Sequence, residues 1–207
     1  MRHSRELSSD STRYISKTSK IFFTADQHYG HARIIDYCNR PFGSVEEMDA
    51  ALIKRHNSVV NKSDLVVHIG DFSLLPSRKT VTERYVRKLK GKHIFLIGDH
   101  DKWLNKNKYA HFYTIQDPRF IYVCLHWPMR TWPMQRYGTY HFHGHSHGRL
   151  PGIGKSIDVG VDNWNYYPAS AKEIRKRIIK EHGRYNFRVY EQNIEALSRG
   201  ALVDQDA

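Results

Sequence analysis

The sequence predicts an α/β fold in a single domain. Short apolar runs typical of buried strands alternate along the chain with segments whose apolar residues recur at helical spacing. The chain has 207 residues, 40% of them hydrophobic, which suffices for one well-covered core but not for two large domains. Most of the early strands also end in a polar residue. Because open α/β sheets bind ligands beyond the carboxyl ends of their strands, we expect a site there.

The first half of the chain predicts a β-α-β-α unit. Residues 21–25 form a short apolar run rich in β-prone side chains, and residues 65–69 repeat that pattern. Between the two runs, Ser44 and Glu47 have the spacing of a capping box, and the apolar residues after them recur at helical spacing. Residues 80–90 predict a short basic helix.

The second half of the chain continues the alternation. We expect a helix at 170–181 and strands at 93–97, 120–125, 138–143, 156–161 and 185–190. We interpret 21–193 as the domain, with 1–20 and 194–207 as flexible tails, because both ends are rich in polar and small residues.

The formal net charge of +12 predicts attraction to polyanions, although the charge could equally serve solubility alone. No apolar run is long enough to span a bilayer, and residues 1–20 lack the apolar core of a secretory signal. The two cysteines, Cys38 and Cys124, have no metal-ligand spacing and agree with a reducing compartment. We therefore expect a cytoplasmic protein without a membrane partner, and the sequence indicates no stable protein partner.

Five short polar segments carry the chemistry. They are Asp26-Gln27-His28, Gly70-Asp71, Gly98-Asp99-His100-Asp101, His126 and Gly144-His145-Ser146-His147. Carboxylate oxygens and imidazole nitrogens suit Mn, Fe or Zn, and the lack of cysteine argues against a structural zinc site. Gly70-Asp71 and Gly98-Asp99 alone would be ordinary turn chemistry, and the alternating histidines from 141 to 147 also fit an adventitious metal-binding tract. Their order along the chain favours a common site.

The order of these segments resembles the pattern of the calcineurin-like metallophosphoesterases, D-x-H, G-D, G-N-H-D or E, H and G-H-x-H. The resemblance covers roughly residues 21–162 and is closest to small bacterial and phage members. It implies an α/β sandwich of two mixed sheets flanked by helices. It also implies a dinuclear metal site that hydrolyses phosphomonoesters or phosphodiesters.

The resemblance further implies a role for each residue. One metal ion would be held by Asp26, His28 and His147, the other by Asp99, His126 and His145, with Asp71 bridging them. Two such cations polarise a phosphoryl oxygen and lower the pKa of a bound water from about 15.7 towards 7. His100 would stabilise the phosphoryl group or protonate the leaving oxygen, and Asp101 would orient the His100 imidazole.

Asp99 departs from the family pattern, which has asparagine at this position. A carboxylate adds negative charge and lacks the NH2 donor of an amide, so we expect weaker turnover of an anionic substrate. The exchange fits either a natural variant or an inactivating substitution. The alternative function is a phosphate- or nucleic-acid-binding protein that has lost turnover.

The substrate prediction depends on charge and aromatic residues. We expect a nucleotide or nucleic-acid phosphate, because basic residues gather at 78–92 and because Trp127 and Arg130 follow a predicted ligand. Arg40 and Asn163, in two further stretches shared with the small members, are predicted to bind substrate as well.

Overall fold

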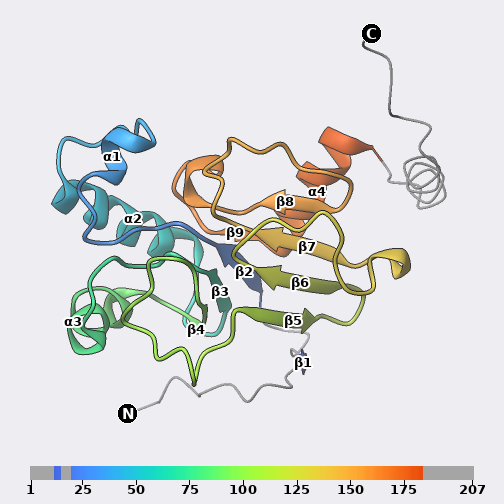
Figure 1. The fold of residues 1–207 in the computed structure, drawn as a ribbon, viewed down its shortest axis with the longest axis horizontal. Coiled ribbons are helices and arrows are strands. Elements are labelled where there is room, and N and C mark those ends of the chain that lie inside the picture. The colour runs from blue at the N-terminus through green and yellow to red at the C-terminus, as the bar shows by residue number, and fades with distance from the viewer. Residues whose placement is uncertain (1–11, 15–19, 184–207) are drawn as a thin grey trace, which may run out of the picture.

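The computed structural model describes residues 12–14 and 20–183, which form two mixed sheets with helices around them (Figure 1). The first sheet has the order β4-β3-β2-β9, and the second has the order β1-β5-β6-β7-β8. This arrangement confirms the expected α/β sandwich. The predicted strand 185–190 and the predicted tail 194–207 lie outside the described residues.

The first sheet is built on three parallel strands, β2 (Ile21–Thr24), β3 (Leu65–Ile69) and β4 (Lys92–Leu96). Every residue of β2 and β3 is buried, which explains their continuous apolar sequences, because strands covered on both faces need no polar alternation. β9 (Ala169–Ser170) closes the sheet antiparallel to β2.

The second sheet mixes both directions. Its strands are β1 (Thr12–Tyr14), β5 (Phe112–Gln116), β6 (Ile121–Leu125), β7 (Tyr140–His143) and β8 (Ser156–Asp158). β6, β7 and β8 run parallel to one another, while β5 and β6 pair antiparallel. β1 pairs parallel with β5 and falls within the segment 1–20 that we interpreted as a tail, and the flexibility of that segment stays a prediction.

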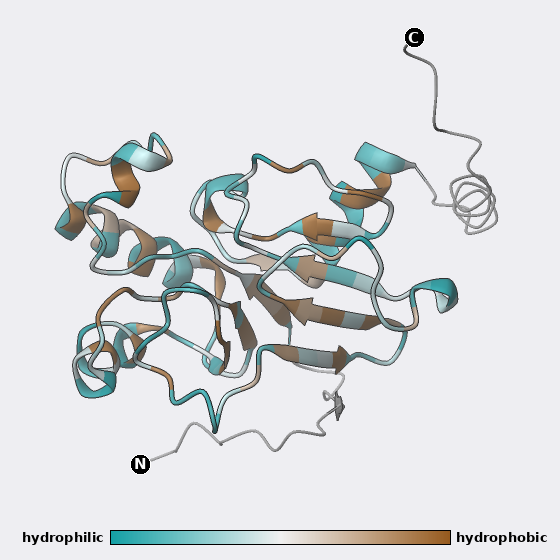
Figure 2. Ribbon diagram, in the orientation of Figure 1, coloured by the Kyte–Doolittle hydropathy of each residue, from teal (hydrophilic) through white to brown (hydrophobic). Residues whose placement is uncertain are grey.

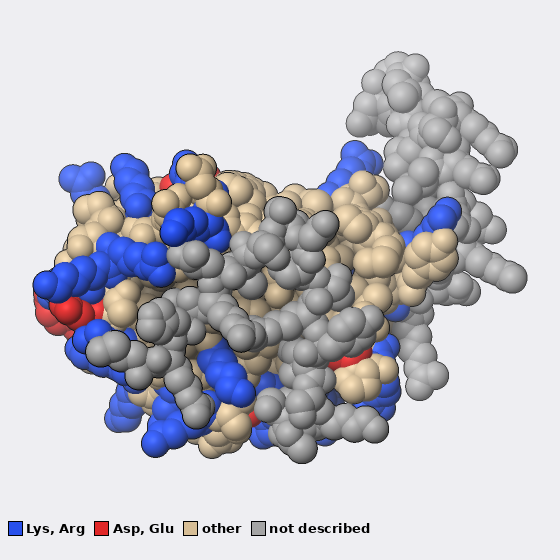
Figure 3. All heavy atoms as spheres, turned by 90° about the horizontal axis from the view of Figure 1, so that it is seen from below, with Lys and Arg blue, Asp and Glu red and all other residues tan. Residues whose placement is uncertain are grey.

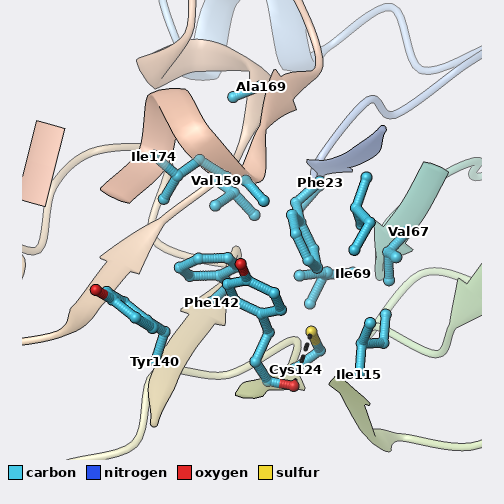
Figure 4. Close-up of a cluster of buried hydrophobic side chains, with 14 of the residues drawn as sticks. Phe23, Val67, Ile69, Ile115, Cys124, Tyr140, Phe142, Val159, Ala169 and Ile174 are labelled. Carbon is cyan, nitrogen blue, oxygen red and sulfur yellow. Dashed lines mark hydrogen bonds between the residues drawn. The ribbon is translucent and has the colours of Figure 1, made fainter. Parts of the chain in front are cut away.

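The main core lies between the sheets. Phe23 of β2 is fully buried and packs edge-on against Phe142 of β7, with ring centroids 4.7 Å apart (Figure 4). Val67 and Ile69 of β3 and Cys124 of β6 belong to the same cluster. Figure 2 shows that hydrophobic residues concentrate on these central strands. Burial of the two inner faces therefore holds the two sheets together.

Helices cover both sides of this sandwich. α1 (Ile34–Tyr37), α2 (Val45–Val59) and α3 (Arg78–Arg84) lie on one side, and α4 (Ala171–His182) lies on the other (Figure 1). Short 3-10 turns occur at η1 (Val86–Lys88), η2 (Gln135–Tyr137) and η3 (Val161–Asn163). None of the helices in the described part of the chain is both long and apolar enough to cross a membrane.

Two local differences from the predicted elements have clear causes. The expected helix at 80–90 divides into α3 and η1 at Tyr85, whose φ of −125° is not helical. The expected strand at 156–161 ends at Asp158, because the Asp158 carboxylate accepts a hydrogen bond from the Gly160 N–H (2.7 Å) and η3 follows.

Candidate metal centre

The predicted ligands follow the carboxyl ends of strands in both sheets. Since β2, β3 and β4 are parallel, the loops after them emerge at one edge of the first sheet. β6 and β7 are likewise parallel, so His126 and the segment 144–147 emerge together from the second sheet. Backbone hydrogen bonds join these loops, from the Asp26 N–H to the Gly70 carbonyl (3.1 Å) and from the Gly144 N–H to the His126 carbonyl (3.0 Å).

The structure brings all seven predicted ligands together. Ligand atoms within 4.8 Å of one another define a first triad of Asp26, His28 and His147 and a second triad of Asp99, His126 and His145. Asp71 joins Asp26 and His126 in a third group that lies between them. These acidic and histidine clusters could bind metal ions, and their donor types suit divalent first-row metals.

Buried nitrogen atoms without partners fit this interpretation. The Nε2 atoms of His28 and His126 are buried and have no hydrogen-bond partner within the described chain. They lie 3.5 and 3.4 Å from the same oxygen, Oδ2 of Asp71. Since buried polar atoms in folded proteins nearly always have a partner, unpartnered nitrogens around one carboxylate oxygen suit a shared cation.

Outer hydrogen bonds orient the imidazoles of this centre. His126 donates from Nδ1 to the Ile69 carbonyl (2.9 Å), and His147 donates from Nδ1 to the Asp162 carboxylate (2.7 Å). Such contacts commonly fix the tautomer of a metal-binding histidine and leave Nε2 free for the ion.

The backbone at the site is strained. Five of the seven predicted ligands have left-handed φ angles, which range from 47° at His147 to 68° at His145 and include Asp26, His28 and Asp71. Non-glycine residues rarely adopt this conformation, and such strain concentrates at functional sites. The loop conformation is therefore set by the position of the side chains.

Glycines allow the loops to approach the carboxylates closely. A Cβ atom added at Gly98 would lie 2.3 Å from Oδ1 of Asp71, and one added at Gly144 would lie 2.7 Å from Oδ2 of Asp26. The His145 N–H donates to the same Asp26 carboxylate (3.0 Å). The Gly in G-D, G-D-H-D and G-H-S-H is thus a packing requirement of the centre as well as a turn residue.

Burial and neighbouring charges raise the pKa values of some residues of the site and lower those of others. Burial lowers the pKa of His28 to about 2 and raises the pKa of Asp26 to about 7. Burial also opposes the charged forms of His126 and Asp71, but the closeness of the imidazole to the carboxylate, with Nε2 3.4 Å from Oδ2, outweighs it. The pKa of His126 is consequently raised to about 9, and the pKa of Asp71 is held well below its usual range.

Asp101 does not have the predicted role. Its buried carboxylate accepts hydrogen bonds from the backbone N–H groups of Asp71 (2.6 Å) and Gly98 (3.0 Å) and from the indole of Trp103 (2.9 Å). None of the hydrogen bonds found for Asp101 in the described chain reaches the His100 imidazole. Asp101 therefore ties together the loops after β3 and β4, and the expectation that it orients His100 is wrong.

His100 lies at the open side of the centre. Its side chain is 45% exposed, with Nε2 at 3.9 Å from Oδ2 of Asp71. Its backbone N–H donates to Oδ1 of Asp71 (2.9 Å), and its ring lies 5.3 Å from that of His28. The imidazole can thus meet a ligand that enters from solvent.

Arg40 also differs from its predicted role. The side chain is buried and forms a two-pronged ion pair with the Asp162 carboxylate (2.8 and 2.9 Å). It further donates to the backbone carbonyls of Asp26 (2.7 Å) and Gln27 (3.0 Å). Because these bonds face into the protein, Arg40 supports the loop after β2 and is not placed to contact substrate.

The three remaining residues predicted to bind substrate are Trp127, Arg130 and Asn163, and their surroundings differ. Trp127 is half-buried, donates from its indole to Oδ2 of Asp99 (3.3 Å) and stands edge-on to His126. Arg130 is exposed three residues further on. Asn163 packs against Gly148, directly after His147, and its amide nitrogen is buried without a partner in the described chain. Their contact with a substrate stays a prediction.

The sequence did not single out Asp162 and His31 as functional residues. Asp162 joins Arg40 and His147, and its only signal in the sequence was its place beside Asn163 in a stretch shared with the small family members. His31 contacts His28 and extends the D-x-H segment by three positions. In contrast, His141 and His143 hydrogen-bond to the backbone, which argues against an adventitious metal-binding tract.

A separate cavity of about 1410 Å³ lies at the amino end of β2, lined among others by Lys20, Trp164 and Arg175. It contains none of the predicted ligands. The predicted ligands lie at the opposite, carboxyl ends of the strands.

Fold and site together define an α/β sandwich protein with histidine and carboxylate clusters able to bind metal. The chain is 36% identical to uncharacterized protein MJ1445 of Methanocaldococcus jannaschii over 168 residues, which are 78% of this chain and 92% of that protein. It belongs to the same family as MJ1445. No protein-family model matches the chain.

Two further comparisons agree with this placement. The Gene 66 protein of Mycobacterium phage L5 is 34% identical over 94 residues, 45% of each chain. The crystal structure of AQ665 from Aquifex aeolicus, a protein of unknown function, superposes with a TM-score of 0.59 at 20% identity. This likeness covers 77% of this chain and all of AQ665, and it shows a shared fold.

Proposed function

We propose that this protein is a phosphoesterase with a dinuclear metal site, which hydrolyses a phosphomonoester or phosphodiester of a nucleotide or nucleic acid. One observation supports this most strongly. Two triads of carboxylate and imidazole ligands lie on either side of Asp71, whose Oδ2 is close to two buried, unpartnered nitrogens.

In this proposal each triad binds one of the two ions. Asp26, His28 and His147 would bind one cation, and Asp99, His126 and His145 the other, with Asp71 between them. Divalent Mn, Fe or Zn ions at such a site polarise a phosphoryl oxygen and make a bound water acidic enough to attack near neutral pH. The fixed loops contribute by holding the ligands without reorganisation.

His100 is the residue of this chain best placed to act on the substrate. Its exposed imidazole stands beside Asp71 and His28, where a phosphoryl group would enter. It can donate a hydrogen bond to a phosphoryl oxygen or a proton to the departing oxygen. Asp71 fixes the His100 backbone through the 2.9 Å hydrogen bond to its N–H.

The surface favours a polyanionic substrate. On the face shown in Figure 3, Lys and Arg side chains are spread widely and acidic side chains are few. The half-buried Trp127 beside Asp99 offers an aromatic surface next to the centre. Positive charge steers phosphates towards the molecule, and an aromatic ring can stack on a base.

Hydrolysis of p-nitrophenyl phosphate and bis-p-nitrophenyl phosphate, with Mn²⁺ added to chelator-treated protein, tests this proposal. We expect metal-dependent turnover that falls at least 100-fold in His126→Ala, because that change removes a ligand of the second triad. His182→Ala, a substitution far along the chain in α4, is the matched control and should keep full activity. Equal activity with and without metal would refute the proposal.

A second function is favoured by Asp99. Its carboxylate lies 3.1 Å from Nδ1 of His145 and 4.0 Å from Nε2 of His126, so the second triad has one negative charge more than the family pattern. A phosphate- or nucleic-acid-binding protein with little turnover would have this feature. Tight binding of nucleotides without hydrolysis, in protein loaded with metal, would support it.

A further inference from the structure

His31 forms a contact with the centre that the seven predicted ligands do not explain. Its Nδ1 lies 3.3 Å from Nδ1 of His28, and the two rings are 5.4 Å apart. A turn closed by the His31 N–H and the His28 carbonyl (3.0 Å) holds the two residues together. Gly30, within this turn, has φ of 75° and donates its N–H to Asp49 (3.2 Å).

The contact defines which nitrogen of each ring carries a proton. Nε2 of His28 is the unpartnered nitrogen near Asp71, so it is the atom free to bind an ion. A neutral imidazole that binds through Nε2 carries its proton on Nδ1. This proton points at Nδ1 of His31, which must therefore accept it.

We propose that His31 is a positioning residue, which fixes His28 as an Nε2 ligand by accepting the hydrogen bond from its Nδ1. The inference rests on the proposed metal site. It gives His28 the outer partner that Ile69 provides for His126 and Asp162 provides for His147. Loss of such a partner typically costs 10- to 100-fold in metal affinity.

Three substitutions separate this role from simple packing. In His31→Asn, the side-chain oxygen can take the place of Nδ1, so the hydrogen bond from His28 is kept. In His31→Gln, the oxygen reaches the position of Nε2, and in His31→Leu no acceptor remains. We expect the Asn variant to bind metal within about threefold of the wild type and the other two to bind one ion 10- to 100-fold more weakly.

Calorimetric titration of the chelator-treated full chain with Mn²⁺ and Zn²⁺ measures these affinities without any substrate. The absorption spectrum of the Co²⁺-loaded protein reports on the ligand geometry, and it should change in His31→Leu but not in His31→Asn. His182→Leu, which removes a histidine from the end of α4, is the matched control and should leave both measurements unchanged.

The outcomes are distinguishable. Equal metal affinity in the wild type, His31→Leu and His31→Gln would overturn the inference and leave the proposed function intact. If the wild type itself bound no divalent metal, the proposed function would fail and the role of His31 with it. If His31→Leu does not fold, the order of His31→Asn and His31→Gln still decides, because both carry the same amide and the extra methylene of Gln moves the oxygen away from the position of Nδ1.

Discussion

At the scale of single residues, the proposed function makes Asp99 the residue whose charge would repel an anionic substrate. Its side chain is 42% exposed and accepts the indole N–H of Trp127 (3.3 Å), a bond that an amide oxygen can also accept. The shape of the site therefore does not require a carboxylate here. Under the proposed function, however, its charge would act directly on a phosphate held between the triads.

Replacement of Asp99 by Asn should raise kcat about tenfold, because it removes one negative charge and adds an NH2 donor near the phosphoryl group. Steady-state kinetics with p-nitrophenyl phosphate and Mn²⁺ would measure this. Asp36→Asn, at an exposed position in α1, is a control for the loss of a carboxylate. An Asp99→Asn variant with equal or lower kcat would contradict the prediction.

Arg40 stabilises the centre through its ion pair with Asp162 and its hydrogen bonds to the backbone of the loop after β2. Its substitution by Met should destabilise the protein by about 3 kcal/mol, because the Asp162 carboxylate, whose side chain is only 9% exposed, loses both hydrogen bonds from Arg40 and keeps only the one from His147. Chemical denaturation of the metal-free protein would measure the free energy of unfolding. Arg55→Met, which removes a half-buried guanidinium that bonds to the Asn165 carbonyl and not to a carboxylate, should cost much less. Equal costs for both variants would show that the ion pair is not important for stability.

The sequence predicted which residues meet at the centre but not which atoms they contact. The polar segments could be located because they follow strands and contain residue types that suit metals, and the family resemblance then implied which of their residues are ligands. Asp101 and Arg40 are charged residues that were also assigned to the site, yet their hydrogen bonds point into the protein. That direction depends on how the loops fold over one another, which spacing along the chain does not specify.

At the scale of elements, the caps of the two long helices differ. At α2, Ser44 accepts from the Glu47 N–H (3.2 Å), but the Glu47 carboxylate accepts from Gly43 rather than from Ser44. At α4, Ser170 and Glu173 form the complete reciprocal capping box. The sequence predicted the capping box at α2, whereas the reciprocal bonds occur at α4.

Ser170→Ala should destabilise the protein by about 1 kcal/mol, because the Glu173 N–H loses its acceptor at the start of α4. α4 contributes Ile174 and Ile178 to the core between the sheets, so loss of its first turn should reduce global stability. Thermal and urea denaturation would measure the change. Ser58→Ala, near the end of α2 at an exposed position, serves as the control. No loss in Ser170→Ala would mean that packing alone holds the helix.

Short elements were the ones that the sequence did not predict. α1 has four residues, β9 has two and β5 mixes exposed and buried positions, so none gives a long periodic pattern. Each is defined by pairing or packing with distant parts of the chain, as β9 is by its antiparallel pairing with β2. The periodicity of hydrophobic residues indicates which face of a single segment is buried, but it does not indicate which distant segment that face pairs or packs with.

At the scale of the whole molecule, the residues showed strands and helices in order, while the division into two sheets came only from the resemblance. Consecutive strands do not reveal where one sheet ends, because β4 and β5 follow each other in the chain yet belong to different sheets. What joins the sheets is the packing of inner faces, such as Phe23 against Phe142. That contact spans more than half of the chain.

Histidines buried in their neutral form make the stability of the whole molecule depend on pH. Burial lowers the pKa values of His93 and His141 to about 4 and places that of His68 well below its usual range. His141 donates from Nδ1 to the Val123 carbonyl (3.1 Å) and accepts at Nε2 from the Met129 N–H (3.0 Å), so no site for a second proton remains.

The direction of the effect follows from the difference between folded and unfolded chains. In the unfolded chain these imidazoles take up protons as the pH falls through about 6.5, whereas the folded chain excludes them until about pH 4. The free energy of unfolding should therefore decrease as the pH falls from 6.5 to 4. Each such histidine lowers the free energy of unfolding by about 1.4 kcal/mol for every pH unit of the fall within that window.

Replacement of His141 by Gln should remove the contribution of His141 to the pH dependence of the free energy of unfolding. The amide of Gln can still donate and accept hydrogen bonds but does not titrate. Urea denaturation of the chelator-treated protein at several pH values between 4 and 7 measures the slope, which does not depend on how much the substitution itself destabilises the fold. Subtraction of the variant from the wild type also cancels the opposing contribution of Asp26, whose raised pKa of about 7 favours folding as the pH falls. The exposed His111→Gln variant controls for the loss of an imidazole. Parallel curves for the wild type and His141→Gln would show that His141 takes up a proton in the folded chain and that its burial does not exclude charge.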